Sequence, residues 1–256
     1  MALSVSACGH DWDEYDPRVG SEGSSQGGGG AAAQGGGASA SSTQQASSGS
    51  GIAGSGGGGG NGGSGDGGVG ASGTIFADEF DADSDAWIPG GTGDWVVADG
   101  ERSQTDATAA LAFDYVPSMA NLSDYHIRSR MRQIDGNFGG AMEIDFRISA
   151  TEPAQQYFCN WEPNSGTFLI MISTAGFAAT EIETMTIDLT TLPNYDPFAA
   201  FTMNIDVIGS EFHCWLEEIP EADLTVNDGS YLTGTFGLKN YAMATAYDFI
   251  HVTAVP

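Results

Sequence analysis

The sequence predicts an all-β protein, a sandwich or barrel of short strands preceded by a disordered N-terminal tether. Three observations predict it. From Thr74 onward, short runs rich in Val, Ile, Phe and Tyr recur with turn residues between them. Several runs alternate apolar and polar residues, which is the period of a half-buried strand. No segment sustains the period of an α-helix, and many short strands in one chain are typical of a sandwich or barrel.

Composition divides the chain of 256 residues into three parts. Most of the 38 glycines precede residue 74, and residues 20–73 are almost wholly Gly, Ser, Ala and Gln. Such a segment cannot bury enough apolar area to offset its ordering entropy. We therefore expect a short polar segment at 1–19, a disordered linker with a span of roughly 40 Å at 20–73, and one globular domain at 74–256.

The charge balance excludes several partners. Seven basic residues face 34 acidic ones, for a formal net charge of −27. Nucleic-acid binding depends on basic residues that neutralise phosphates, so DNA and RNA are excluded. An anionic membrane surface would also repel the domain. No run approaches the roughly 18 consecutive apolar residues of a transmembrane helix, so we expect membrane contact only through a lipid anchor.

The N-terminal segment Leu3–Gly9 has the sequence Leu-Ser-Val-Ser-Ala-Cys-Gly. It resembles a lipobox, the site where bacterial signal peptidase II cuts before a cysteine that is then acylated. The resemblance implies a lipidated Cys8, and Gly9 after it implies the outer membrane of a bacterial cell envelope. Only seven residues precede Cys8, too few for the charged and apolar regions of a signal peptide. Either a leader lies further upstream or the motif is not a signal.

The expected strands are separated by turns rich in Gly, Asn and Asp, such as Asp99-Gly100 and Asp228-Gly229. A turn at 135–137 is expected to join two of them as a hairpin. The strands are expected at 74–80, 95–98, 109–115, 125–134, 141–148, 156–161, 167–174, 184–189, 201–208, 211–217, 235–239 and 247–255.

Alternation assigns the faces of several strands. The residues expected to point inward are Tyr125, Ile127, Met131, Met142, Ile144, Phe146, Ile148, Phe201, Met203, Ile205, Val207, Phe212, Cys214 and Leu216. Those expected to point outward are His126, Arg128, Arg130, Arg132, Glu143, Asp145, Arg147, Asn204, Asp206, His213, Trp215 and Glu217. Residues 168–172 are apolar throughout, as in a strand covered on both faces.

Short motifs follow one another in a fixed order along the domain. They are Phe76–Phe80, Trp87, Gly93–Gly100, Leu122–Tyr125, Gly139-Gly140, Arg147, Tyr157-Phe158, Ile205–Gly209, Gly234–Leu238 and Tyr247–Val252. Their order and spacing resemble the concanavalin A-like lectin/glucanase superfamily, in particular its laminin-G-like and 3-keto-disaccharide-hydrolase-like jelly rolls. The resemblance implies a two-sheet antiparallel jelly-roll sandwich, but this fold hosts lectins, hydrolases and adhesion modules alike.

The residues Glu143-Ile144-Asp145 match part of a catalytic motif of that superfamily. Its retaining glucanases carry a nucleophile, an assisting Asp and a general acid as Glu-x-Asp-x-x-Glu on one strand, with the two carboxyls about 5–5.5 Å apart. Ile148 stands where the acid is required. Without a proton donor the leaving group would depart as an alkoxide. We therefore expect a non-catalytic domain, with a sugar-active hydrolase as the alternative.

Two interpretations of the outward polar residues stay open. In the first, three arginines of one strand form cross-strand ion pairs with Glu143 and Asp145, each contributing at most about 1 kcal/mol. In the second, a polar face hydrogen-bonds a glycan, and a tryptophan stacks on it. The candidate ligand-binding residues are Arg128, Arg130, Arg132, Glu143, Asp145, Arg147, Trp161, Asp206, His213 and Trp215.

A structural calcium ion is a further expectation. The segment 81–85 starts like an EF-hand loop, but Ala86 and Thr92 occupy the positions that require Gly and an acid. Related sandwiches often hold an ion near the first and last strands, which implies Asp78, Glu79, Asp81 and Asp248 as ligands. The four histidines are scattered in sequence and lack the spacing of a zinc site.

The cysteines predict a disulfide. Acylation would consume Cys8, and unpaired thiols rarely persist in an oxidising envelope, so Cys159 and Cys214 are expected to pair. Their Cα atoms must then lie within about 4.4–6.8 Å. The alternative is two separate buried cysteines. Taken together, the sequence predicts a surface-tethered bacterial lipoprotein whose sandwich binds an extracellular glycan or protein; a hydrolase and a purely structural envelope lipoprotein are the alternatives.

Overall fold

The computed structural model describes residues 73–255, apart from the side chains of Asn137 and Phe138. Cys8, the segment 1–19 and the linker up to residue 72 lie outside the described residues. The strands are β1 (Thr74–Asp78), β2 (Ile88–Gly91), β3 (Trp95–Ala98), β4 (Glu101–Gln104), β5 (Ala112–Tyr115), β6 (Tyr125–Ile148), β7 (Gln156–Glu162), β8 (Thr167–Ser173), β9 (Ala179–Thr186), β10 (Ala200–Ile208), β11 (Glu211–Leu216), β12 (Asp223–Asn227) and β13 (Thr235–Ala254). Short 3₁₀ helices occur at η3 (Pro117–Met119), η4 (Ala175–Phe177) and η5 (Leu189–Thr191). Among these described residues, no helix has the length and apolarity needed to cross a membrane.

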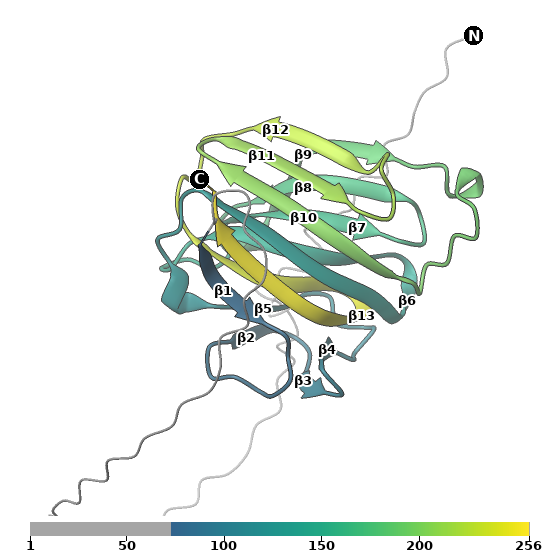
Figure 1. Cartoon of the computed structure of the whole chain (residues 1–256), viewed down its shortest axis with the longest axis horizontal. Coiled ribbons are helices and arrows are strands. Elements are labelled where there is room, and N and C mark those ends of the chain that lie inside the picture. Colours follow the sequence, from purple (N-terminus) through teal and green to yellow (C-terminus); the bar gives the residue numbers. More distant parts are fainter. Residues whose placement is uncertain (1–72, 256) are drawn as a thin grey trace, which may run out of the picture. The chain divides into compact units, whose positions relative to one another are not determined.

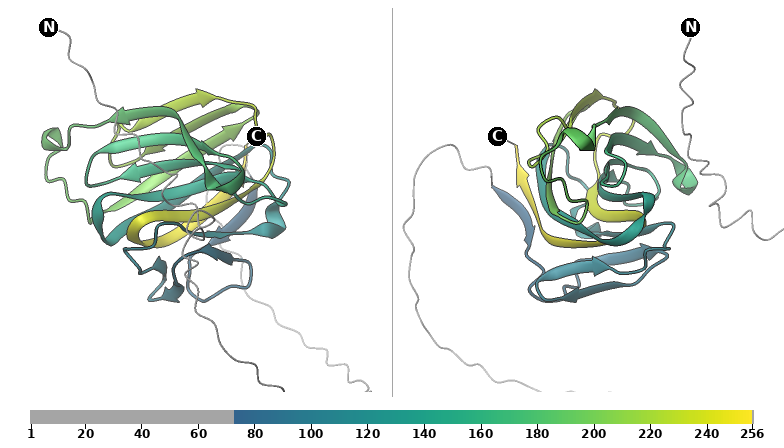
Figure 2. Two further views of the ribbon diagram at one scale, coloured as in Figure 1. Left: turned by 180° about the vertical axis from the view of Figure 1, so that it is seen from behind. Right: turned by 90° about the vertical axis from the view of Figure 1, so that its right-hand side faces the viewer.

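The strands form the two layers of an antiparallel jelly-roll sandwich, which confirms the predicted fold class (Figure 1). In the first sheet the order is β12-β11-β10-β6-β13, and β1 and β4 lie along β13. In the second sheet the order is β9-β8-β7-β6-β13-β5-β2. Figure 2 shows the two layers from behind and on edge.

The long strands β6 and β13 belong to both sheets. The N-terminal half of β6 pairs with β10, its C-terminal half pairs with β7, and β13 runs beside both halves. The predicted hairpin at 135–137 is therefore wrong, because the chain bends from one sheet into the other instead of reversing. The bend requires glycine at Gly140, where a Cβ atom would lie only 2.6 Å from the carbonyl oxygen of Ala242.

The core lies between the two sheets. Every residue that alternation predicted to point inward is at most 3% exposed. The uniformly apolar strand β8 is also covered on both faces, since Phe168, Leu169, Ile170 and Met171 are all buried. The period-2 pattern thus located the core correctly on both sheets.

The predicted disulfide is confirmed. It joins Cys159 on β7 to Cys214 on β11, with the two Cα atoms 6.5 Å apart. Both residues are fully buried. Because β7 belongs to the second sheet and β11 to the first, the bond crosses the core and ties the two layers together.

Candidate functional site

Six of the predicted ligand-binding residues share one surface, the side of the first sheet that faces away from the core. We call this surface the outer face. Its predicted members come from three adjacent strands, β6, β10 and β11, and are Arg128, Arg130, Arg132, Asp206, His213 and Trp215. The structure thus brings together more than half of the predicted set on an accessible surface.

The arginines of the outer face do not form the predicted ion pairs with Glu143 and Asp145. Arg128 instead forms a bidentate salt bridge with Glu217, with its Nε 2.8 Å from the carboxylate. Arg132 pairs in the same way with Glu101, at 2.9 Å from Nε. The prediction failed because β6 is one continuous strand, so its two halves lie end to end rather than side by side.

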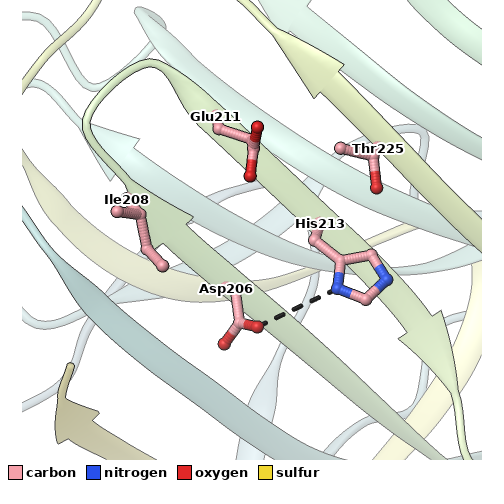
Figure 3. A pocket seen from close by; sticks show the side chains of 5 residues that line it. All are labelled: Asp206, Ile208, Glu211, His213 and Thr225. Carbon is pink, nitrogen blue, oxygen red and sulfur yellow. Dashed lines mark ion pairs between the residues drawn. The ribbon is translucent and has the colours of Figure 1, made fainter. Parts of the chain in front are cut away.

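A small cavity opens on the outer face (Figure 3). It measures about 130 Å³ and is lined by Asp206, Ile208, Glu211, His213 and Thr225. Next to it, the imidazole of His213 stacks on the indole of Trp215, with ring centroids 4.4 Å apart. The cavity is thus bounded by two carboxylates and an imidazole, and Ile208 and Thr225 complete its lining.

A second group of polar side chains lies on the side of the second sheet that faces away from the core. Strands β6, β7 and β13 place it there by alternation, between the core residues of the same strands. We call this surface the enclosed polar face; its members are Glu143, Asp145, Gln156, Asn160 and Lys239, each at most 4% exposed. The prediction that Glu143 and Asp145 face solvent is therefore wrong.

An ion pair lies at the centre of the enclosed polar face. The Lys239 ammonium is 2.6 Å from a carboxylate oxygen of Glu143 and 3.8 Å from one of Asp145. It also sits 3.3 Å above the ring centroid of Phe158, a cation–π contact. Asn160 donates a hydrogen bond of 3.0 Å to the other oxygen of Glu143. Glu143 is thus held as a paired carboxylate.

Several atoms of the enclosed polar face have no hydrogen-bond partner. They include both carboxylate oxygens of Asp145, the amide nitrogen of Gln156 and the amide oxygen of Asn160, although Gln156 and Lys239 lie close enough to Asp145 to influence its pKa. Burial raises the pKa of Asp145 to about 7; the Lys239 ammonium limits the rise and the Glu143 carboxylate adds to it. Since more than nine in ten buried polar groups are normally bonded, this concentration of unpaired atoms requires an explanation.

The enclosure of this face involves two phenylalanines from distant strands. Phe113 on β5 lies opposite Lys239, and its ring is 5.3 Å from that of Phe177 in the β8–β9 connection. Strands β8 and β5 are separated by β7, β6 and β13, which would put them about 19 Å apart in a flat sheet. The second sheet is therefore curled, so that Phe113 on β5 and Phe177 in the β8–β9 connection meet over the polar face.

Two other predicted ligand residues are structural. Trp161 is fully buried and packs edge-on against Phe168 and Phe201, so it cannot serve as a surface platform. Arg147 was predicted to point outward but is 1% exposed. It adopts a left-handed backbone with φ of 53°, and its guanidinium donates to three backbone carbonyls, those of Ser123, Gly209 and Tyr231.

The four candidate calcium ligands are not brought together. Asp78 accepts hydrogen bonds from the Phe80 amide and from the Trp87 indole. The remaining candidates lie apart: Glu79 pairs with His251, Asp248 lies 3.6 Å from Arg130, and Asp81 is exposed. Among residues 73–255, no group of three such side chains is assembled around a common point.

Sequence reasoning missed Gln156, Asn160 and Lys239. One signal could have found the last of them. Lys239 is the only lysine in a chain of net charge −27, and it lies in an otherwise apolar strand segment. A lysine is rarely buried unless it is paired, so a single lysine in such a segment indicates a buried carboxylate partner.

Comparison with known proteins supports the fold. No protein-family model matches the chain, and no curated protein sequence matches it. The carbohydrate-binding module CBM66 from Bacillus subtilis superposes with a TM-score of 0.56 at 17% identity, covering 66% of this chain and 96% of that module. A Bacillus subtilis protein of unknown function with a galectin-like fold gives 0.56 at 15% identity, covering 71% and 96%. The β-glucanase of Bacillus licheniformis gives 0.52 at 9% identity, covering 72% and 99%.

These likenesses show that the domain has a jelly-roll fold. They bear out the jelly-roll fold that the resemblance implied. At identities of 9–17% they show the fold alone, so the function is argued from the side chains of this chain.

Proposed function

We propose that the domain is a non-catalytic carbohydrate-binding module whose ligand is held by the enclosed polar face, which it reaches when the contact of Phe113 with Phe177 opens. The observation that carries the proposal is the set of incompletely hydrogen-bonded atoms on Asp145, Gln156 and Asn160. Leaving such a group buried and unpaired costs about 1–3 kcal/mol. Sugar hydroxyls both donate and accept hydrogen bonds, so a glycan supplies partners for the carboxylate and for both amides.

Apolar side chains on the same face suit the other part of a sugar. Phe158, Leu169 and Met171 form a small cluster beside Asp145, separate from the main core. A sugar ring presents C–H groups on its faces and hydroxyls at its edges. Ligand sites of this kind combine an apolar lining with a few fixed polar groups, as this face does.

Binding is favoured over hydrolysis by the state of Glu143. The Lys239 ammonium at 2.6 Å neutralises the carboxylate that would have to act as nucleophile. The position that requires the general acid is occupied by Ile148, which is buried in the core. Its neighbour Arg147 donates to backbone carbonyls and is not available as an acid either. The same strand therefore offers polar contacts to a glycan without the acid that retaining hydrolysis requires.

Polysaccharide binding by the Asn160→Ala variant tests the proposal. We expect the purified protein to bind at least one soluble polysaccharide in affinity electrophoresis, and Asn160→Ala to raise the Kd about tenfold or more, because one buried hydrogen-bonding group is lost. The matched control is Asn204→Ala on the first sheet, where Asn204 bonds Glu217; its Kd should not change.

Access to the face provides a second readout of the same experiment. Phe177→Ala removes the ring that contacts Phe113 at 5.3 Å and should raise the association rate for the bound polysaccharide. A protein that binds no glycan on an array, or whose binding is equally reduced by Asn204→Ala and Asn160→Ala, would refute this site. A purely structural envelope protein or a protein-binding module would then be the better interpretation.

We further propose that the module is presented by a lipid anchor at Cys8, with residues 20–73 as the spacer. The support is the Leu3–Gly9 motif and the composition of the linker. When the gene is expressed in bacteria with its upstream region, the protein should incorporate a palmitate analogue. Cys8→Ser should abolish the label and release the protein from the membrane fraction. Full labelling of the Cys8→Ser variant would contradict the anchor.

A further inference from the structure

Two histidines and an aspartate form a row across three neighbouring strands of the outer face. His126 on β6 lies directly opposite Asp206 on β10, and Asp206 lies directly opposite His213 on β11. All three side chains are partly exposed, whereas their strand neighbours Tyr125 and Phe212 are in the core. We call these three residues the histidine row; Figure 3 shows two of its members at the cavity.

Both imidazoles direct the same nitrogen at the aspartate. His126 Nδ1 is 2.8 Å from one carboxylate oxygen of Asp206, and His213 Nδ1 is 3.9 Å from the other. A zinc ion with bonds of about 2.0–2.2 Å holds tetrahedral ligand atoms roughly 3.4 Å apart. The two observed separations bracket that value, so each imidazole nitrogen lies at a distance from Asp206 that is compatible with a shared ion.

Further contacts restrain the ring of His213 and leave its Nδ1 directed at Asp206. Its second nitrogen, Nε2, is 2.9 Å from a carboxylate oxygen of Asp223 on β12. A metal-bound histidine typically donates its other N–H to a carboxylate, which fixes the tautomer and the ring orientation. The stacked indole of Trp215 restrains the same ring and also lies 5.8 Å from the His126 ring.

We propose that the histidine row binds a divalent first-row transition ion, with zinc as the representative, through His126 Nδ1, Asp206 and His213 Nδ1. Two neutral imidazoles and a carboxylate are the donor set that such ions prefer over calcium or magnesium. Among residues 73–255 no assembled three-ligand group is present, so the rings must rotate on binding. The cavity of about 130 Å³ beside His213 leaves room for water or a small ligand at the remaining coordination position.

This site is independent of the enclosed polar face, since it lies on the other sheet. The sequence positions of the histidines are scattered and gave no sign of this arrangement. Of the three histidines in residues 73–255, His126 and His213 share a carboxylate, whereas His251 pairs with Glu79. His251 is therefore a matched control.

Titration calorimetry of the full chain with zinc chloride tests the proposal, with calcium chloride in a parallel titration. We expect the wild type to bind zinc and His126→Ala and His213→Ala each to weaken that binding at least tenfold, while His251→Ala leaves it unchanged. Asp223→Asn should weaken it by about 10–100-fold, as expected for loss of a carboxylate that orients a metal-bound histidine. Cobalt(II) should give visible absorption bands that are lost in His126→Ala.

Three results would overturn the site. The first is the absence of zinc binding by the wild type. The second is zinc binding that survives both His126→Ala and His213→Ala, which would place the ion elsewhere, for example at His10. The third is calcium binding as tight as zinc binding, which would indicate carboxylates without imidazoles. Unchanged melting temperatures of the variants exclude unfolding as the cause of lost binding, since these side chains lie on the surface.

Discussion

Replacing Cys159 and Cys214 together with alanine is expected to lower the free energy of unfolding by about 4 kcal/mol, on the chain-entropy account of a loop of this length. The two residues are 55 positions apart, and their Cα atoms lie 6.5 Å from each other across the core. The bond joins β7 of one sheet to β11 of the other, so without it the unfolded chain regains the freedom to separate these strands.

Differential scanning calorimetry measures the effect. For a domain of this size the loss corresponds to a fall in melting temperature of about 8–16 °C. Reduction of the wild type should give a similar fall, and Cys8→Ala, outside the described residues, should give none. Reaction of both Cys159 and Cys214 with a thiol reagent in the unfolded but unreduced wild type, or a double variant as stable as the parent, would contradict the stabilising role of the bond.

The sandwich could be predicted because alternation reports burial on one side of a strand. The inward positions Met142, Ile144 and Phe146 were located from this pattern alone, and all are fully buried. The hairpin at 135–137 was wrong because glycine permits both a reversal and a bend. Only the pairing of β13 with both halves of β6 decides between them, and that pairing joins residues about a hundred positions apart.

The candidate site was predicted less well, for a physical reason. Alternation cannot distinguish a polar side that meets solvent from one that is enclosed by the curl of the sheet, so Glu143 and Asp145 were assigned to solvent. The histidine row was hidden for a related reason. His126 and Asp206 are 80 positions apart, and only the register of β6 with β10 places them together.

Replacing Asp145 with asparagine is expected to stabilise the domain at neutral and alkaline pH while it weakens glycan binding. Burial raises the pKa of Asp145 to about 7 in the folded domain, above the value near 3.9 of an unfolded chain. Between about pH 4 and pH 7 the folded state therefore holds a proton that the unfolded state has lost. Its contribution to stability is complete below about pH 4 and is lost as the pH rises to about 7.

The free energy of unfolding that the wild type loses over this pH range amounts to roughly 4 kcal/mol at most. The uncharged amide of the Asp145→Asn variant would recover it above pH 7. Urea unfolding at pH 4 and pH 8 measures it: wild type and Asp145→Asn should be similar at pH 4, and the variant should be more stable at pH 8. The control Asp94→Asn, at an exposed position, should follow the wild type at both values.

The polysaccharide Kd of the same variant decides what the buried carboxylate is for. A residue kept for stability should destabilise the fold when it is replaced, whereas a residue kept for binding is retained in spite of its cost. We therefore expect Asp145→Asn to gain stability at pH 8 and to lose affinity for the polysaccharide. Loss of stability at both pH values would instead make Asp145 a structural partner of Lys239, 3.8 Å away, and would remove it from the binding site.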